Sequence, residues 1–228
     1  MSNLYGLIFD VDGVIADTEE VNARASIKMF ADLFGLTGIV RQDFQAGLGR
    51  GAEAYVQAAA RIHGLHLTPE QVEQATRIRQ ENFLRILADE PLPAFEGVLE
   101  LIAAAMARDD FRVAIATSGT REKSQAVLDS AKVPYQKMIY IAGSDVKNKK
   151  PHPELFLTAA NRCGIEPTRC VVIEDAPNGI AAANAAGSKC IAVTNSTTAE
   201  NLALADIVVP SLTQVSIETV KTLCDMPG

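Results

Sequence analysis

The stretch YGLIFDVDGV, residues 5–14, joins an apolar run to two acidic residues and a glycine. A short apolar run of this kind predicts a strand that is buried on both faces, as strands of parallel sheets are. Asp10 and Asp12 then leave the strand at its carboxyl end, where Gly13 lets the chain turn away sharply. Two carboxylates this close repel each other unless a cation or a proton lies between them. The stretch therefore predicts a parallel sheet with a candidate site at the end of its first strand.

Further apolar runs follow along the chain, and most of them are separated by segments with helical spacing. The expected strands cover residues 5–10, 112–117, 138–142, 170–175, 189–193 and 206–209. The expected helices between them cover residues 97–107, 122–130, 154–162 and 178–186. Strands that alternate with helices predict βαβ units. The expected fold class is therefore α/β, with a Rossmann-like, doubly wound parallel sheet as the core.

One interval is much longer than a strand crossover requires. About a hundred residues separate the first two strands, whereas a crossover needs only a dozen or more. Residues 17–92 are almost entirely helical in pattern, and Thr68-Pro69-Glu70-Gln71 is typical of a capped helix start. We therefore expect two domains, a core of residues 1–16 and 93–228 and an inserted helical cap of residues 17–92.

Composition narrows the possible partners and the compartment. The 228 residues include 21 basic and 28 acidic ones, for a net charge of −7, which disfavours nucleic acid as a partner. No apolar run reaches the roughly 20 residues that span a bilayer, and the first residues do not resemble a signal peptide. The four cysteines lack metal-binding spacing and are expected to be reduced, mostly buried thiols. These features predict a cytoplasmic protein without a membrane partner.

Polar residues of complementary kinds follow other expected strands. Thr117 and Ser118 open one helix, Lys150 precedes a proline, and Glu174 and Asp175 end an apolar run. Each has an ordinary explanation alone: a helix cap, a surface lysine, or acids beside a helix start. The carboxyl ends of parallel strands, however, meet at one edge of the sheet. Acids there suit Mg²⁺, a hydroxyl and a lysine suit phosphoryl oxygens, and a carboxylate can act as nucleophile.

The order and spacing of these residues carry a family resemblance over essentially the whole chain. DVDGV, Thr117, Lys150-Pro151 and IEDAPNGI resemble the four motifs of the haloacid dehalogenase-like hydrolase superfamily. Within it, the chain resembles the subgroup of β-phosphoglucomutase, CbbY-like proteins and small sugar-phosphate phosphatases, which carry a helical cap after the first strand.

The resemblance implies a role for each motif residue. Asp10 would be the nucleophile, Asp12 the general acid and base, and Thr117 and Lys150 the groups that bind phosphoryl oxygens. Mg²⁺ would be the cofactor. The implied metal ligands are Asp10, the backbone carbonyl of Asp12, Asp175, and Glu174 either directly or through water. An alkoxide leaving group needs a proton and a halide does not, so Asp12 favours phosphate chemistry over dehalogenation.

Residues expected to contact the substrate are less sharply marked. Gly49 and Arg50 lie in the glycine-spaced loop GLGRG, which suits a guanidinium that reaches phosphate or sugar oxygens. Arg85 resembles a basic residue that the mutase presents to the distal part of its substrate. Solvated arginines are the alternative at both positions. The remaining expected substrate contacts are Thr18, Ser118 and Asn178.

One position departs from the mutase pattern. Asn22 stands where the mutase carries a histidine that couples cap closure to proton transfer, and an amide has no proton that titrates near neutral pH. We therefore expect a Mg²⁺-dependent phosphatase of a small phosphorylated metabolite, a sugar or polyol phosphate, acting as a monomer or weak homodimer. A phosphohexomutase of the β-phosphoglucomutase kind is the alternative, and a non-catalytic regulator that binds phosphate is a third.

Overall fold

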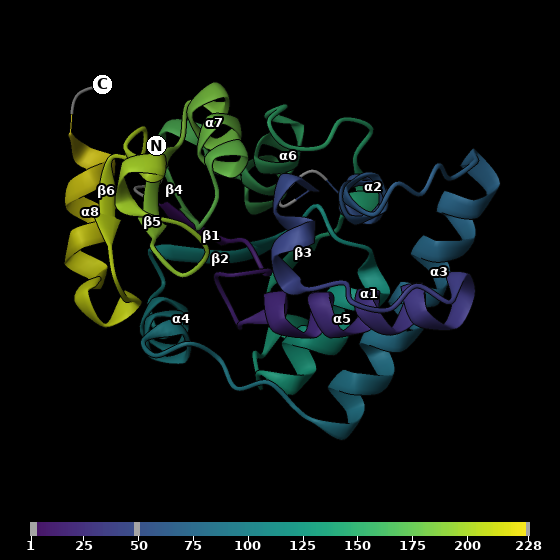
Figure 1. The fold of residues 1–228 in the computed structure, drawn as a ribbon. Helices are drawn as coiled ribbons and strands as arrows, with labels where there is room; N and C mark the ends of the chain where they lie inside the picture. Colours follow the sequence, from purple (N-terminus) through teal and green to yellow (C-terminus); the bar gives the residue numbers. More distant parts are fainter. Residues whose placement is uncertain (1–3, 48–50, 227–228) are drawn as a thin grey trace. The chain divides into compact units, whose positions relative to one another are not determined.

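A sheet of parallel strands in the order β3-β2-β1-β4-β5-β6 forms the core of the protein (Figure 1). The computed structural model describes residues 4–47 and 51–226. Its strands are β1 (Tyr5–Phe9), β2 (Phe111–Ala116), β3 (Ile139–Ile141), β4 (Cys170–Glu174), β5 (Lys189–Val193) and β6 (Ile207–Val209). Strand order runs outward from β1 to β3 on one side and from β4 to β6 on the other. The expected α/β fold with a doubly wound parallel sheet is confirmed.

The two central strands explain why the sheet forms. Every residue of β1 and β4 is buried, so both faces of each strand lose contact with water. Leu7 pairs with Val113 of β2 and with Val171 of β4, which places apolar side chains in register across the centre. The reversal of strand order lies between β1 and β4. In doubly wound sheets, ligand sites form outside the carboxyl ends of the strands at this switch point.

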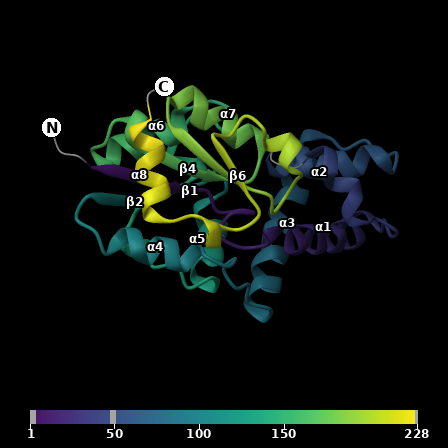
Figure 2. The ribbon, with the colours of Figure 1, turned by 90° about the vertical axis from the view of Figure 1, so that its left-hand side faces the viewer.

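Helices cover both faces of this sheet. The core unit contains α4 (Val98–Met106), α5 (Arg121–Ser130), α6 (Glu154–Cys163), α7 (Pro177–Ala186) and α8 (Ile217–Asp225). In Figure 2, α6 and α7 lie on one side of the strands, whereas α4 and α5 lie on the other. Short 3-10 helices in its loops are η2 (Tyr135–Lys137), η3 (Gly143–Asp145), η4 (Pro167–Arg169), η5 (Ala199–Leu202) and η6 (Leu212–Gln214). The helix α8 was not expected from the sequence.

The segment between β1 and α4 is helical. It contains α1 (Thr18–Phe34), η1 (Arg41–Gly47), α2 (Ala52–Ile62) and α3 (Pro69–Asp89). At the start of α3, the Thr68 hydroxyl accepts a hydrogen bond from the Gln71 backbone N–H, and the Gln71 side chain accepts one from the Thr68 N–H. This reciprocal cap is the one that the sequence predicts. Aromatic packing of Phe44 on Tyr55, with ring centroids 4.6 Å apart, supports the interior of this segment.

The chain divides into two compact units. One consists of Met1–Asp17 and Leu92–Gly228, and the other of Thr18–Pro91. The sequence places the domain boundaries at 16/17 and 92/93, and a capping role for the helical unit stays a prediction. In the core unit, the Phe95 N–H donates to the Ile15 carbonyl at 2.8 Å, so the chain leaves and re-enters this unit at one point.

The cysteines and the length of the helices can be compared with the sequence expectations. All four cysteines are buried free thiols, as the sequence predicts. None of the helices in residues 4–47 and 51–226 combines the length and the apolar character that crossing a membrane requires.

Neighbouring leucines of α6 offer a matched test of this packing. Leu155 is fully buried among residues of the sheet and α7, whereas Leu157 is 40% exposed. Leu155→Ala should lower the free energy of unfolding by about 2–5 kcal/mol, because it removes buried methyl groups and leaves a cavity. Leu157→Ala should change it by about 0.5 kcal/mol or less. Urea unfolding followed by circular dichroism measures both, and equal losses would contradict the placement of α6.

Candidate active site

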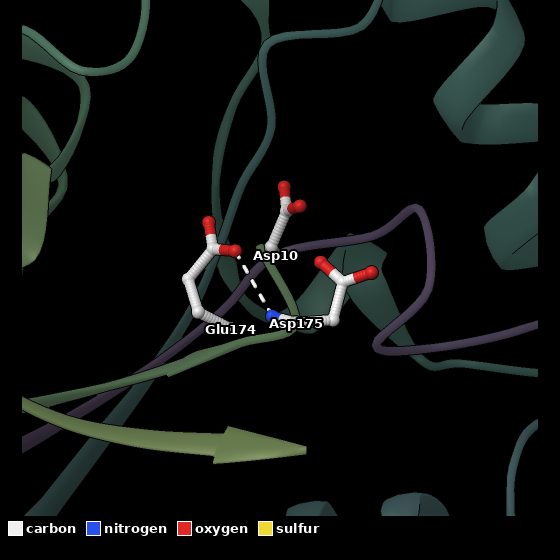
Figure 3. A group of neighbouring side chains, drawn as sticks. All are labelled: Asp10, Glu174 and Asp175. Carbon is white, nitrogen blue, oxygen red and sulfur yellow. Dashed lines mark hydrogen bonds between the residues drawn. The ribbon is translucent and has the colours of Figure 1, made fainter. Parts of the chain in front are cut away.

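Three carboxylates meet where β1 and β4 end. Asp10 follows β1, and its backbone N–H donates to the Ile173 carbonyl of β4 at 3.1 Å, which joins the two strand ends. Glu174 is the last residue of β4, and Asp175 follows it. One oxygen from each of the three side chains lies within 4.8 Å of the others (Figure 3). All three residues are buried, so this is a concentrated negative charge at the switch point of the sheet.

Lys150 places a single ammonium against this cluster. It lies in the loop before α6, and its Nζ is 2.9 Å from Asp10 Oδ1 and 2.5 Å from Glu174 Oε1. Burial alone would lower the pKa of Lys150, but the charges of Asp10 and Glu174 raise it above its usual value. Lys150 is therefore a permanent cation at the site.

One lysine does not neutralise three carboxylates, so a net negative charge remains at the cluster. Burial raises the pKa of Asp10 to about 7, and the charges of Glu174 and Asp12 add to this while Lys150 opposes it. The pKa of Asp175 is also raised, by burial and by the charges of Glu174 and Asp10. Asp10 Oδ1 is paired with Lys150 by charge, yet it accepts no hydrogen bond from any described residue. Carboxylate oxygens in this arrangement fit a hard divalent cation such as Mg²⁺.

Glu174 is held more tightly than the two aspartates. Its Oε1 accepts from Lys150, and its Oε2 accepts from the backbone N–H groups of Asp175 at 3.0 Å and Ala176 at 3.3 Å. A Cβ on Gly179 of α7 would lie 1.9 Å from this carboxylate, so only glycine fits beneath it. These contacts leave Asp10 and Asp175 as the acids with more capacity for direct metal coordination, and Glu174 as one better suited to hold a water.

Asp12 lies in a different environment from Asp10. Its side chain is about one-third exposed, and its Oδ1 lies 2.8 Å from Nζ of Lys123 on α5. Lys123 could not be singled out from the sequence, because a lysine in the first turn of an amphipathic helix is typically solvated. A Cβ on Gly119 would lie 3.8 Å from Asp12 Oδ2, so the carboxylate also faces the loop after β2.

That loop contributes the two expected hydroxyl groups. Thr117 is buried, and its Oγ1 accepts a hydrogen bond from the Gly119 N–H at 3.1 Å. Ser118 Oγ is buried and has no hydrogen-bond partner among the described residues. Asn178 lies in the first turn of α7 and is half-buried. The structure thus brings Asp10, Glu174, Asp175 and Lys150 into one cluster, with Thr117 beside Gly119.

The expected substrate residues of the helical unit are placed less uniformly. Thr18 is the first residue of α1 and is buried, whereas Arg85 is exposed on α3. Gly49 and Arg50 lie outside the described residues.

A buried arginine in this unit was missed by the sequence analysis. Nη2 of Arg79 donates to Asn22 Oδ1 at 2.7 Å, and its Nε donates to Ser26 Oγ at 2.8 Å. The guanidinium carbon lies 4.7 Å from the ring centroid of Tyr55. Its position was the available signal, because Arg79 lies four residues from Ala75 and from Phe83, both of which are buried on the same helix. Asn22 is thus part of a buried polar network rather than a solvated amide.

Comparison with known proteins agrees with the geometry of the strand ends. The family model described as haloacid dehalogenase-like hydrolase matches residues 6–187. The chain is 30% identical over 230 residues to protein CbbY of Rhodobacter capsulatus, covering 96% of this chain and 99% of that protein. It is 32% identical over 190 residues to fructose-1-phosphate phosphatase YqaB of Escherichia coli K12, covering 82% and 95% of the two chains.

A solved structure shows the same likeness in three dimensions. The crystal structure of a CbbY variant from Rhodobacter sphaeroides in complex with xylulose-(1,5)bisphosphate superposes with a TM-score of 0.83 and 26% identity. The match covers 96% of this chain and 99% of that one. With the family model spanning both β1 and β4 and the acids that end them, the chain belongs to the haloacid dehalogenase-like hydrolase family.

Proposed function

We propose that the protein is a Mg²⁺-dependent phosphatase that hydrolyses a small phosphorylated sugar or polyol through an aspartyl-phosphate intermediate. The observation that carries the proposal is Lys150, whose ammonium lies between Asp10 and Glu174 in a buried group of three carboxylates. A phosphoryl group needs a nucleophile, cations around its oxygens, and an acid for the leaving group. The strand ends supply residues of each kind.

In the first step, an oxygen of Asp10 attacks the phosphorus while the bond to the sugar oxygen breaks. Asp12, two residues away and partly exposed, donates a proton to that oxygen, which leaves as an alcohol. Lys150 and the hydroxyl of Thr117 bind the phosphoryl oxygens. Asp10 and Asp175 would hold Mg²⁺, which when bound offsets the negative charge of the acids and of the phosphoryl group.

In the second step, a water molecule attacks the phosphorus of the aspartyl phosphate. Asp12, now ionised, accepts a proton from this water, and inorganic phosphate is released with Asp10 restored. Lys123 Nζ lies 2.8 Å from Asp12 Oδ1 and holds this carboxylate in place through both steps. Ser118 Oγ has no partner among the described residues, which supports a role as a further hydrogen-bond donor to the phosphate.

The substrate class rests on the relatives and on the helical unit. Fructose-1-phosphate phosphatase is a similar protein by name, and a similar CbbY structure contains xylulose-(1,5)bisphosphate. We take the helical unit as the cap that reads the substrate. In it, the exposed Arg85 is accessible to a substrate, whereas the buried guanidinium of Arg79 is held by Asn22 and Ser26. Arg85, Arg50 and Gly49 therefore stay predictions.

Hydrolysis is favoured over isomerisation by Asn22. A mutase must keep water from its phosphoenzyme until the bound intermediate turns over. Here the side chain at position 22 is a buried amide that accepts a hydrogen bond from Arg79. An amide has no titrating proton with which to couple closure to catalysis, so the observation supports a hydrolase.

Phosphate release from a panel of esters tests this function. Fructose 1-phosphate, xylulose 1,5-bisphosphate, polyol phosphates and β-glucose 1-phosphate with a trace of the 1,6-bisphosphate are incubated with Mg²⁺. We expect phosphate from at least one ester, none in EDTA, and none with Asp10→Asn, since the amide is nearly isosteric but not nucleophilic. If glucose 6-phosphate forms faster than inorganic phosphate, the protein is a mutase and the assignment as a hydrolase is wrong. If the Asp10→Asn variant is active, Asp10 is not the nucleophile.

Asp12 can be tested with two leaving groups. Asp12→Asn should slow hydrolysis of an alkyl phosphate by about 10²–10⁴-fold, because the alkoxide then leaves without a proton donor. The loss should be much smaller for p-nitrophenyl phosphate, whose leaving group is stable as an anion. Steady-state rates on the two substrates give the comparison. Equal losses on both would assign Asp12 to another role.

The negative charge of the cluster should make the stability of the folded protein depend on pH. The pKa of Asp10 rises from 3.8 to about 7 on folding, so the folded state keeps a proton that the unfolded state loses. The free energy of unfolding contributed by Asp10 therefore falls as pH rises through this interval. Mg²⁺ replaces the proton, so at about 100 times its Kd it should raise Tm by roughly 5–10 °C near pH 8 and by less near pH 5.

Thermal melting at the two pH values measures this difference, with Asp10→Asn as the control. The variant lacks the titrating carboxylate, so its Mg²⁺-dependent shift should be small at both pH values. A shift in the wild type that is larger near pH 5 than near pH 8 would contradict the placement of the metal among these acids.

A further inference from the structure

The loop after β5 reaches the acid cluster through the side chain of Ser196. The Ser196 hydroxyl donates a hydrogen bond to Oδ2 of Asp175. Its neighbour Asn195 donates from Nδ2 to the Gly13 carbonyl at 2.8 Å. Two adjacent side chains of one loop therefore hold the acid that follows β4 and the turn that follows β1.

Gly13 shows how closely these groups are packed. A Cβ at this position would lie 1.8 Å from Asp175 Oδ2 and 2.5 Å from Ser196 Oγ, and the backbone φ of 75° is one that favours glycine. The Asp175 carboxylate therefore lies directly against the backbone of the turn, with the serine hydroxyl beside the same oxygen. Its Oδ2 is fixed by these two contacts. No hydrogen bond to Oδ1 is found within the described part of the chain, so Oδ1 remains for a cation.

Ser196 differs in kind from the group that holds Asp10. Lys150 brings a positive charge to Asp10, and such a charge opposes the binding of a metal cation. A hydroxyl orients a carboxylate and favours its ionised form without adding charge. At Asp175, the hydrogen bond from Ser196 opposes the rise in pKa that burial and the neighbouring acids cause. Asp175 is thus oriented by a neutral group, without a second positive charge beside the cluster.

We propose that Ser196 is a positioning residue for the divalent cation: it sets the affinity for Mg²⁺ by aiming Oδ1 of Asp175 into the acid cluster. This inference rests on the proposed function for the metal site itself. Side chains that hydrogen-bond to metal ligands typically contribute 10–100-fold to metal affinity. Ser196 lies on an exposed loop, where water can replace the hydroxyl, so we expect the lower end of that range.

Isothermal titration of Mg²⁺ into the protein, without substrate, tests the proposal on four proteins. Ser196→Ala should bind Mg²⁺ about 10-fold more weakly than the wild type. Ser196→Thr keeps the hydroxyl and should stay close to the wild type. The matched control is Thr197→Ala, which removes the hydrogen bond from Asn201 to the Thr197 hydroxyl in the same loop and does not touch Asp175. It should bind as the wild type does.

Turnover provides a second readout. The Mg²⁺ concentration for half-maximal rate should rise in Ser196→Ala by the same factor as the Kd, with kcat at saturating Mg²⁺ close to that of the wild type. An unchanged Kd in Ser196→Ala overturns the proposal. So does weakening in Thr197→Ala or in Ser196→Thr to the same extent, because the loop rather than the hydroxyl would then matter. A wild type that binds no Mg²⁺ would instead contradict the proposed function.

Discussion

Repulsion among three buried carboxylates is the interaction to which the rest of the site is adapted. Asp10, Glu174 and Asp175 are close enough to share one ion, and Lys150 supplies a single positive charge among them. Without further compensation, such a group lowers its free energy most readily by binding protons. The raised pKa values of Asp10 and Asp175 reflect this tendency. A divalent cation is the alternative that leaves a carboxylate ionised and nucleophilic.

The backbone around the cluster is shaped by the same acids. Gly13 and Gly179 lie against the carboxylates of Asp175 and Glu174, and a side chain at either would collide with an oxygen less than 2 Å away. Asp10 and Asp12 are only two residues apart, yet their side chains lie in different environments. Asp10 is buried beside Lys150, whereas Asp12 is partly exposed beside Lys123. Different surroundings of this kind allow neighbouring carboxylates in one site to differ in their chemistry.

The strands were predictable because they are buried on both faces. β1 and β4 are continuous apolar runs, and the observed strands end within one residue of the expected positions. The helix α8 was missed because its buried residues, Val220, Leu223 and Cys224, form a narrow stripe in a polar segment. Strand order could not be predicted either, because chain order does not specify that β1 lies beside β4.

Site residues could be predicted from the sequence only where a local pattern marks them. Residues on strand ends were identified because they follow apolar runs, and the structure brings three of them, Asp10, Glu174 and Asp175, together. Lys123, Arg79 and Ser196 were not, since each occurs where polar residues are ordinary: a helix start, a helix face and a hydroxyl-rich loop. Their importance depends on partners far along the chain, such as Asp12 for Lys123 or Asp175 for Ser196. These residues become neighbours only when the chain folds, so the sequence pattern does not reveal the pairs.

The hydrogen bond from the Phe95 N–H to the Ile15 carbonyl has a consequence for how such a protein can change over generations. It closes the core at the two residues between which the helical unit is inserted, so β1 and β2 remain paired whatever the length of the chain between them. The entropy of closing a loop grows only slowly, by about 0.6 kcal/mol for each doubling of its length. The inserted segment can therefore lengthen or shorten over generations at a small cost in folding free energy, while the strands of the core stay as they are.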